Sequence, residues 1–332
     1  MLALLEAVSR SFYLTVKVLP GGVREPIALA YLLARATDTV ADTNAVSVDG
    51  RLDYLRLLRE RIASTHTTPL PSGSFVEAQA TAGERLLLNR LEALIELLEH
   101  EPPELRDPIR AVLATITSGQ ELDLVRFRDA DAQHLVALET DAELDDYTYR
   151  VAGCVGEFWT EICRRQLFPK VWVDLKSLLA RSVRFGKGLQ LVNILRDVPA
   201  DLRQGRCYVP ARALAGHGLA PAELLDAANG PRFRPLFTKY LQVAEEHLES
   251  GWTYTTLLPY RLLRLRLACA WPLLIGIRTL ARLRVGNVLD ATQRIKVSRG
   301  EVRAIMARTI GLYPFPGIWN RLFERARRQA VR

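Results

Sequence analysis

Apolar residues recur at intervals of three and four along most of this 332-residue sequence. This period matches the turn of an α-helix, whereas a half-buried strand would alternate at every second residue. The segments that carry it are Ile27 to Asp42, Leu52 to Ile62, Gly83 to Glu99, Ile109 to Phe127, Tyr147 to Cys163, Leu178 to Asp197, Leu236 to Leu258 and Leu262 to Leu283. Convincing strand pairs joined by tight turns are not evident. The pattern therefore predicts an all-α protein.

Three stretches rich in Gly and Pro interrupt the helical pattern and are expected to be loops. They are Ser64 to Phe75, Glu101 to Pro103 and Ala213 to Phe233. None is long or biased enough in composition to be a domain linker, and no internal repeat is visible. We therefore expect one domain over residues 1–332, larger than a four-helix bundle but packed by the same rules.

The composition narrows the class of protein. Hydrophobic residues make up 49% and charged residues 25%, as in a globular protein with a sizeable core. The net charge of +8 suits nucleic acid, an anionic membrane or a polyanionic small substrate. No RNA-recognition signature is present, and basic residues do not alternate with aromatic ones along one surface element. We therefore expect no nucleic-acid partner.

Cysteine usage and the N-terminal residues predict a cellular compartment. The four cysteines form no Cys-x-x-Cys pair and have no His at zinc-ligand spacing, so reduced thiols in a cytosolic protein are expected. Met1 to Leu14 contains Glu6 and Arg10 and lacks the apolar region of a signal peptide. No run of about 18 apolar residues could span a bilayer. A cytoplasmic protein without a transmembrane helix is expected.

The first candidate site is Asp38 and Asp42, which stand four residues apart in a predicted helix, with Arg35 beside them. Residues at this spacing share one helix face. Counting back by fours and threes reaches Tyr31 and Ile27, so this face should point inward. Two carboxylates on an inward face are costly unless a cation neutralises them.

The second candidate site follows Gly188. At 100° per residue, Gln190, Asn193, Asp197 and Asp201 fall within roughly 80° of one another. Oxygen ligands without His or Cys suit hard cations such as Mg²⁺. An Asp pair at this spacing is common on solvated helices. Two such pairs, each near an Arg on an apolar helix, favour a metal site.

Taken in order, these and other motifs resemble the squalene/phytoene synthase family of head-to-head prenyltransferases. The matching segments are Ser9-Arg10-Ser11-Phe12, Tyr31 with Arg35-Ala-Thr-Asp38-Thr-Val-Ala-Asp42, Tyr147-Thr-Tyr-Arg-Val-Ala-Gly153-Cys-Val-Gly156, Gln190-Leu-Val-Asn193-Ile-Leu-Arg196-Asp197-Val-Pro-Ala-Asp201, Gly205-Arg206-Cys-Tyr208-Val-Pro210 and Lys296-Val-Ser-Arg299-Gly300-Glu301. They run from residue 9 to about residue 301 in the order and spacing of the family.

The resemblance implies an isoprenoid-synthase-type helical bundle around a central cavity, with the two acidic motifs facing each other across its mouth. Two molecules of farnesyl diphosphate would bind there. The residues implied to hold Mg²⁺ are Asp38, Asp42, Gln190, Asn193, Asp197 and Asp201. The residues implied to bind the diphosphates are Arg10, Ser11, Arg35, Arg196 and Arg206.

The resemblance also implies catalytic roles. Tyr147 matches a tyrosine linked to the proton removal that closes the cyclopropane of presqualene diphosphate, and Phe12 and Tyr31 match positions that line the pocket. Lys296 and Arg299 match a late basic motif expected to bind NADPH. This motif and the Gly-Glu-Phe-Trp-Thr run from residue 156 favour the squalene-forming members. The alternatives are dehydrosqualene, phytoene or hydroxysqualene synthases, which need no reductant.

Two positions depart from the family pattern. Pro199 lies inside the second acidic motif, so the helix should kink or end near Val198, and the direction of Asp201 is less well defined than that of Asp197. Ser298 stands where many squalene-forming members carry a basic residue, which weakens the expected NADPH site.

The basic tail, residues 312–332, has two interpretations. Phe315, Ile318, Trp319, Leu322 and Phe323 lie among several Arg. Such a segment could rest on an anionic bilayer as a peripheral membrane contact. Alternatively it is a final helix packed on the core with a solvated Arg face. The sequence does not decide between these two, and it gives no oligomeric state.

Overall fold

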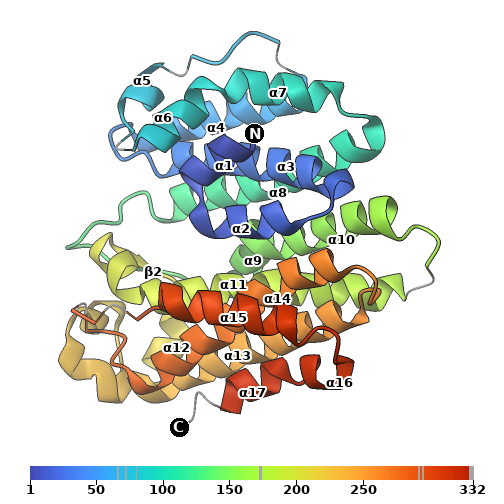
Figure 1. Ribbon diagram of the computed structural model, residues 1–332. Helices are drawn as coiled ribbons and strands as arrows, with labels where there is room; N and C mark the ends of the chain where they lie inside the picture. The colour runs from blue at the N-terminus through green and yellow to red at the C-terminus, as the bar shows by residue number, and fades with distance from the viewer. Residues whose placement is uncertain are drawn as a thin grey trace. The chain divides into compact units, whose positions relative to one another are not determined.

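The computed structural model describes residues 1–65, 67–71, 73–79, 81–171, 174–290, 292–293 and 295–328, and of Arg10 and Ser11 only the backbone. Helices make up almost all of its regular structure, which confirms the all-α prediction (Figure 1). The chain forms two compact units, Met1–Arg128 with Glu157–Trp172, and Asp129–Gly156 with Val173–Arg332. Each is considered by itself.

The first unit consists of the N-terminal helices and most of α10. Its helices are α1 (Leu2–Val8), α2 (Arg10–Val18), α3 (Gly21–Ala41), α4 (Val48–Ile62), α5 (Gly73–Glu77), α6 (Ala82–Asn89), α7 (Leu91–His100), α8 (Pro103–Arg126) and α10 (Cys154–Leu167). Helix α3 contacts α4, α7 and α8. Its buried residues include Leu29, Leu32 and Leu33. The helix that carries the first acidic motif is therefore central to the core of this unit.

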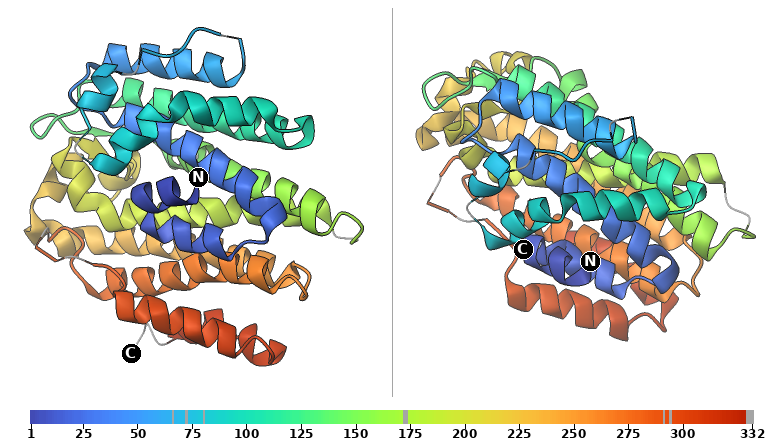
Figure 2. Two further views of the ribbon diagram at one scale, coloured as in Figure 1. Left: turned by 45° about the horizontal axis from the view of Figure 1, so that its top comes forward. Right: turned by 90° about the horizontal axis from the view of Figure 1, so that it is seen from above.

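The second unit is larger. Its elements are β1 (Val136–Ala137), α9 (Asp141–Thr148), the π-helix η1 (Tyr149–Gly153), α11 (Leu175–Arg203), β2 (Arg206–Cys207), α12 (Ala211–Ala215), the 3₁₀ helices η2 (Pro221–Leu225) and η3 (Ala227–Asn229), α13 (Gly230–Leu257), α14 (Leu263–Val285), α15 (Arg299–Gly311), α16 (Pro316–Trp319) and α17 (Leu322–Arg328). Helices α11, α13 and α14 lie alongside one another (Figures 1 and 2). The two short strands pair in parallel.

Caps explain where several helices begin. The side chains of Thr140 and Asp174 accept hydrogen bonds from the third residue of α9 and of α11, at 3.3 and 3.2 Å. Such caps satisfy backbone donors that the first turn leaves unpaired. Helix α8 begins at Pro103, where a missing N–H costs nothing.

Three expected helices differ from the prediction. The segment Gly83 to Glu99 is two helices, because the N–H of Arg90 bonds to the carbonyls of both Leu86 and Leu87 and the next helix starts at Leu91. The segment from Tyr147 contains the π-helix Tyr149–Gly153. Helix α11 does not end near Val198 but continues through Pro199 to Arg203. Burial of residues before and after Pro199 holds it despite the lost hydrogen bond.

Packing against the protein accounts for much of the tail. Trp319, Leu322 and Phe323 are buried within the second unit. The indole of Trp252, on α13, donates a hydrogen bond to the carbonyl of Asn320 and stacks on the ring of Trp319. These contacts agree with a final helix packed on the core. Among the described residues, no helix is both long and apolar enough to cross a bilayer.

Candidate functional site

The first acidic motif is built around Arg35 on α3. Its guanidinium pairs with Asp38, one turn further along the same helix, and with Glu84 on α6, where Nη2 and Oε1 are 2.9 Å apart. All three side chains are partly exposed. The arginine therefore joins two carboxylates from different helices at a point that solvent can reach.

Glu84 is held by the start of its own helix. Thr81 caps α6 by accepting a hydrogen bond from the N–H of Glu84, and its hydroxyl donates to Glu84 Oε2 at 2.7 Å. This leaves Oε1 for Arg35. Glu84 was not among the predicted site residues. The Thr-x-x-Glu spacing, which is typical of a capping box, is the signal that could have located it.

An aromatic pair lies one helical turn before Arg35. The rings of Phe12 and Tyr31 stack with centroids 4.1 Å apart and an angle of 19° between planes. Ser9 caps α2 by accepting from the N–H of Phe12, and its side chain also hydrogen-bonds to Tyr31. The structure therefore brings these two predicted residues together. The side chains of Arg10 and Ser11 lie outside the described residues.

The two carboxylates of the first motif repel each other. Desolvation by the surrounding protein raises the pKa of Asp38, the negative charge of Asp42 raises it further, and Arg35 opposes both. Asp42 itself is exposed and caps the C-terminus of α3, with its N–H bonded to the carbonyl of Asp38 at 2.9 Å. The sequence predicted that this helix face points inward. In the structure the face is half-buried at Asp38 and exposed at Asp42. A cation beside both carboxylates would relieve their repulsion.

The second acidic motif lies on α11. Arg196 pairs with its neighbour Asp197, with Nε and Oδ1 2.8 Å apart, and the pKa of Arg196 is raised chiefly by that hydrogen bond. Asp201 adds to the rise through its charge. Gln190 and Asp201 are partly exposed and Asn193 is exposed, so this strip of oxygen-bearing side chains is accessible to solvent.

A glycine turn places Arg206 just beyond α11. Gly205 has a φ of +80°, and a Cβ there would lie 2.4 Å from the backbone of Asp131. A residue with a side chain is strained in this conformation. The chain then enters β2, where the N–H of Val136 donates to the carbonyl of Gly205 at 2.8 Å. Arg206 is therefore fixed in backbone position by the two-strand sheet.

Tyr147 has a partner that the sequence analysis did not assign. Its hydroxyl donates to the hydroxyl of Tyr208 at 3.4 Å, and the two buried rings stack with centroids 4.8 Å apart. Tyr208 follows β2, two residues after Arg206. Its place in the matched Gly-Arg-Cys-Tyr-Val-Pro segment was visible in the sequence, but its pairing depends on the fold.

Close backbone contacts hold the helical segment after Tyr147 against α11. A Cβ at Gly156 would lie 2.0 Å from the carbonyl oxygen of Ser182, and one at Gly186 would lie 2.1 Å from that of Ala152. Distances this short leave no space for a side chain. Ala152 belongs to the π-helix and Gly156 follows it, and π-helical turns often occur near functional sites.

The late basic motif contains the start of α15. Ser298 caps this helix in a reciprocal arrangement with Glu301, which also pairs with Arg282 at 2.6 Å. The hydroxyl of Ser298, the residue that departs from the family pattern, therefore has a local structural role. The side chains of Lys296 and Arg299 are exposed.

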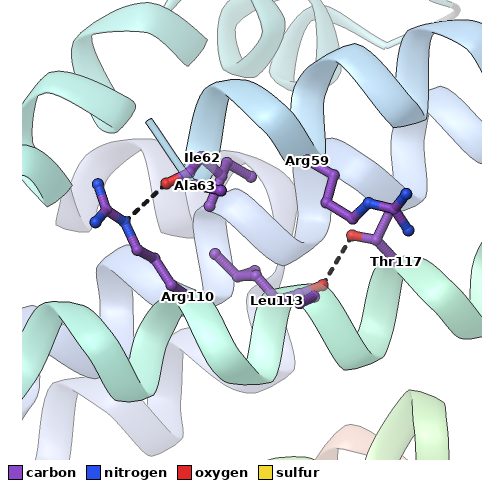
Figure 3. A pocket seen from close by; sticks show the side chains of 7 residues that line it. Arg59, Ile62, Ala63, Arg110, Leu113 and Thr117 are labelled. Atoms are coloured by element: carbon purple, nitrogen blue, oxygen red, sulfur yellow. Dashed lines mark hydrogen bonds between the residues drawn. The ribbon is translucent and has the colours of Figure 1, made fainter. Parts of the chain in front are cut away.

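A small pocket between α4 and α8 is lined by Arg59, Ile62, Ala63, Arg110, Leu113, Ala114 and Thr117 (Figure 3). Its volume of about 30 Å³ corresponds to a few water molecules at most. Arg110 donates to the carbonyl of Ile62 at 2.8 Å across it. The pocket is too small for a prenyl chain and contains none of the predicted site residues.

The donor set fits Mg²⁺ in its chemistry. The predicted ligands offer only carboxylate and amide oxygens, which this ion prefers. Within the part of the chain that the structure describes, no three His, Cys, Asp or Glu side chains are grouped so that they could hold a metal. The metal assignment therefore stays a prediction.

Comparison with known proteins gives a consistent result. The sequence profile of the family described as Squalene/phytoene synthase matches residues 5–301. A bifunctional lycopene cyclase/phytoene synthase of Phaeosphaeria nodorum is 30% identical over 240 residues, which are 71% of this chain and 38% of that protein. A squalene synthase of Schizosaccharomyces pombe is 26% identical over 314 residues, or 93% of this chain and 64% of that protein. The chain thus spans less than two thirds of either relative.

The fold is also found among solved structures. A ligand complex of TcSQS has a TM-score of 0.76 at 20% sequence identity, with 99% of this chain and 97% of that chain covered. At this level of identity the likeness concerns the fold alone. The match extends across both compact units of this chain.

Proposed function

Because the chain belongs to the squalene/phytoene synthase family, a family of prenyltransferase-type enzymes, we propose that it joins two molecules of farnesyl diphosphate through presqualene diphosphate and reduces the product to squalene with NADPH. Residues 1–332 would then act as one catalytic domain. The observation that carries this proposal is that α3 and α11 each place an Asp against an Arg at a solvent-accessible position.

The arginines would assist the departure of diphosphate. When the C–O bond of the first substrate breaks, the electron pair leaves with the diphosphate, whose charge must be neutralised. Arg35 and Arg196 are each partly exposed, so their guanidinium groups can turn towards an arriving phosphate. Arg206, fixed after Gly205, would add a third positive charge. Guanidinium groups bind phosphate oxygens in pairs.

Magnesium would be held by Asp38 and Asp42 from α3 and by Gln190, Asn193, Asp197 and Asp201 from α11. When bound, this ion neutralises negative charge on the diphosphates and fixes their orientation. Arg35 and Arg196, which pair with Asp38 and Asp197, would turn from these carboxylates towards the phosphates.

Aromatic side chains would stabilise the allylic cation that remains after the first diphosphate leaves. The stacked rings of Phe12 and Tyr31 offer π-faces that stabilise positive charge. The second substrate's double bond attacks this cation, and loss of a proton then closes the cyclopropane. The hydroxyl of Tyr147 would take part in removing this proton, and its hydrogen bond to Tyr208 would orient it.

Presqualene diphosphate would then lose its diphosphate, and the resulting cation would rearrange. The final product depends on what reaches this rearranged cation. Hydride gives squalene, proton loss gives dehydrosqualene and water gives hydroxysqualene. Lys296 and Arg299 would bind the phosphates of NADPH, and both side chains are exposed. Ser298, which lies between them in sequence, caps a helix and adds no positive charge to this site. The phytoene synthase relative supports a second candidate, a synthase that needs no reductant.

Product analysis tests the proposal. Purified protein would be incubated with farnesyl diphosphate and Mg²⁺, with and without NADPH, and in parallel with a C20 prenyl diphosphate. We expect squalene with NADPH and presqualene diphosphate, dehydrosqualene or hydroxysqualene without it. If NADPH changes neither rate nor product, the reductant-independent alternative holds. No consumption of either diphosphate would overturn the assignment as a prenyltransferase.

A further inference from the structure

Two turns at one end of the second unit are joined into one surface. The turn between α13 and α14 contains Tyr260, and the turn between α15 and α16 contains Tyr313. The hydroxyl of Tyr260 donates to the carbonyl of Tyr313 at 2.6 Å, and the hydroxyl of Tyr313 donates to the carbonyl of Tyr260. Their rings stack with centroids 4.7 Å apart. The two turns are therefore held side by side.

Large apolar side chains in these turns and in the helices beside them are exposed to solvent. We define the apolar end surface as Leu257, Tyr260, Ile310, Phe315 and Ile318, which are between 38% and 56% exposed. Backbone hydrogen bonds link the last three into consecutive turns, from Tyr313 to Ile310 and from Ile318 to Phe315. Soluble proteins rarely gather this many exposed apolar groups without a partner.

The apolar end surface is supported rigidly from beneath. The guanidinium of the buried Arg266 lies 4.6 Å from the ring centroid of Trp319, 5.5 Å from that of Tyr260 and 5.6 Å from that of Tyr313. This cation ties rings from both turns together. Phe315 and Ile318 therefore remain exposed because the aromatic residues beside them already fill the interior.

The two chain segments that carry this surface have charges of one sign. Between Gly251 and Leu289, and again between Val302 and Phe323, arginines are the only charged residues of the sequence. Arg261, Arg308 and Arg321 are exposed and lie within a few residues of the apolar side chains. Exposed apolar groups surrounded by arginines are complementary to a lipid bilayer, whose interior is apolar and whose headgroups can be anionic.

We propose that the apolar end surface is a docking site for an anionic lipid bilayer, into which Phe315 and Ile318 insert while the surrounding arginines contact the headgroups. This inference does not depend on the proposed function. It differs from the interfacial tail considered from the sequence, since Trp319, Leu322 and Phe323 face the protein core. The contact is made by two turns and the helix ends beside them rather than by one side of a single helix.

Vesicle flotation tests the proposal. The full chain is mixed at low salt with phosphatidylglycerol vesicles or with phosphatidylcholine vesicles. We expect binding to the anionic vesicles only, and its loss at high salt. Phe315→Ser combined with Ile318→Ser should lower the bound fraction about tenfold. Arg261→Gln and Arg321→Gln should each weaken binding about fivefold.

Val285→Ser is the matched control. Val285 is 81% exposed, in the same unit, at the opposite end of α14 from the apolar end surface. This variant should bind vesicles as the unchanged protein does, and circular dichroism should show that all variants fold. The proposal is overturned by no binding to anionic vesicles at low salt or by an equal loss in Val285→Ser. It is also overturned if the protein is a dimer and the Phe315 and Ile318 changes dissociate this dimer without changing vesicle binding.

Discussion

The acidic motifs of α3 and α11 have the same Asp spacing but differ in construction. In α3, Arg35 pairs with carboxylates from two helices, Asp38 and Glu84, and the helix ends at the motif, so that Asp42 is its cap. In α11, Arg196 pairs with Asp197 next to it, and the helix continues beyond Asp201 to Arg203. Equal spacing in sequence therefore does not give equal geometry.

The difference concerns what holds each carboxylate. The position of Asp42 depends on the last turn of α3 and is open to solvent. The position of Asp201 depends on the packing of α11, whose residues Val198 and Leu202 are buried on either side of Pro199. The first motif thus receives support from α6, whereas the second is supported by its own long helix. Substitutions can separate these two kinds of support.

Removal of one carboxylate from each motif should have the largest effect. Asp38→Ala and Asp197→Ala should each reduce turnover about 1,000-fold, because a lost metal ligand removes several kcal/mol of transition-state stabilisation. Helical content by circular dichroism should not change. Matched controls are Asp53→Ala, which breaks an exposed pair with Arg56 at the spacing of Arg35–Asp38, and Asp107→Ala, which breaks a pair with the adjacent Arg106. Turnover that survives in either motif would show that only one of them is catalytic.

The tyrosine pair in the second unit should come next. Tyr147→Phe should lower conversion of farnesyl diphosphate about 100-fold and conversion of supplied presqualene diphosphate far less, since it removes only the hydroxyl of the proposed proton transfer. Tyr208→Phe should produce a smaller loss of the same kind, with KM unchanged. Tyr240→Phe, which removes a hydroxyl bonded to Asp141, is the control. Equal losses for both substrates would contradict the assigned role.

The glycine contact that fixes α11 should affect stability. Gly156→Ala places a methyl group against the carbonyl of Ser182 and should lower the free energy of unfolding by about 1–3 kcal/mol. Gly311→Ala, where nothing lies within 4 Å of the added carbon, should change it by less than about 1 kcal/mol. Urea titration measures both. Equal stability of the two variants would show that α11 is not positioned by this contact.

Glu84 tests the support that the first motif receives from α6. Glu84→Gln keeps the size of the side chain and removes the charge that Arg35 shares between α3 and α6. Turnover should fall several-fold, about 1 kcal/mol in activation free energy, as for a partly exposed ion pair. Glu121→Gln, which breaks the comparable pair with Arg59 at 3.0 Å, should leave turnover unchanged. A loss as large as that for Asp38→Ala would mean that Glu84 itself contacts substrate or metal.

The smallest effect on substrate consumption should come from the late basic motif. Lys296→Ala and Arg299→Ala should leave the rate of farnesyl diphosphate consumption within about twofold, while raising the NADPH concentration needed for squalene or diverting the product. Product distribution by gas chromatography is the measurement, and Arg303→Ala on the same helix is the control. If consumption itself collapses, these residues belong to the diphosphate site.

Periodicity predicted the all-helical fold because helix cores leave a strong pattern in sequence. It also placed Arg35 beside the acidic pair, and the structure pairs Arg35 with Asp38, three residues further on the same helix face. Boundaries were less accurate. The break at Arg90 and the continuation through Pro199 are set by tertiary packing, which favours burying the leucines on both sides of each point.

Contacts between distant segments could not be predicted. Glu84 reaches Arg35 across 49 residues, and Tyr208 reaches Tyr147 across 61. Neither separation follows a helical period, so only the folded chain reveals them. The burial of Trp319 and Phe323 was similarly undecided, because the same apolar side of the tail would suit either a bilayer or a protein core.

The π-helix at Tyr149–Gly153 has a consequence for comparing sequences within the family. A π-turn holds one residue more than an α-turn, so it offsets the register between Tyr147 and the glycines that contact α11. Deleting a single residue there would restore α-helical winding and leave the residues that follow on the same faces, whereas the same deletion in a regular α-helix would rotate them by about 100°. An alignment that places a one-residue gap in this segment would therefore mark relatives that lack the π-turn but keep the tyrosine and the glycines on the same faces.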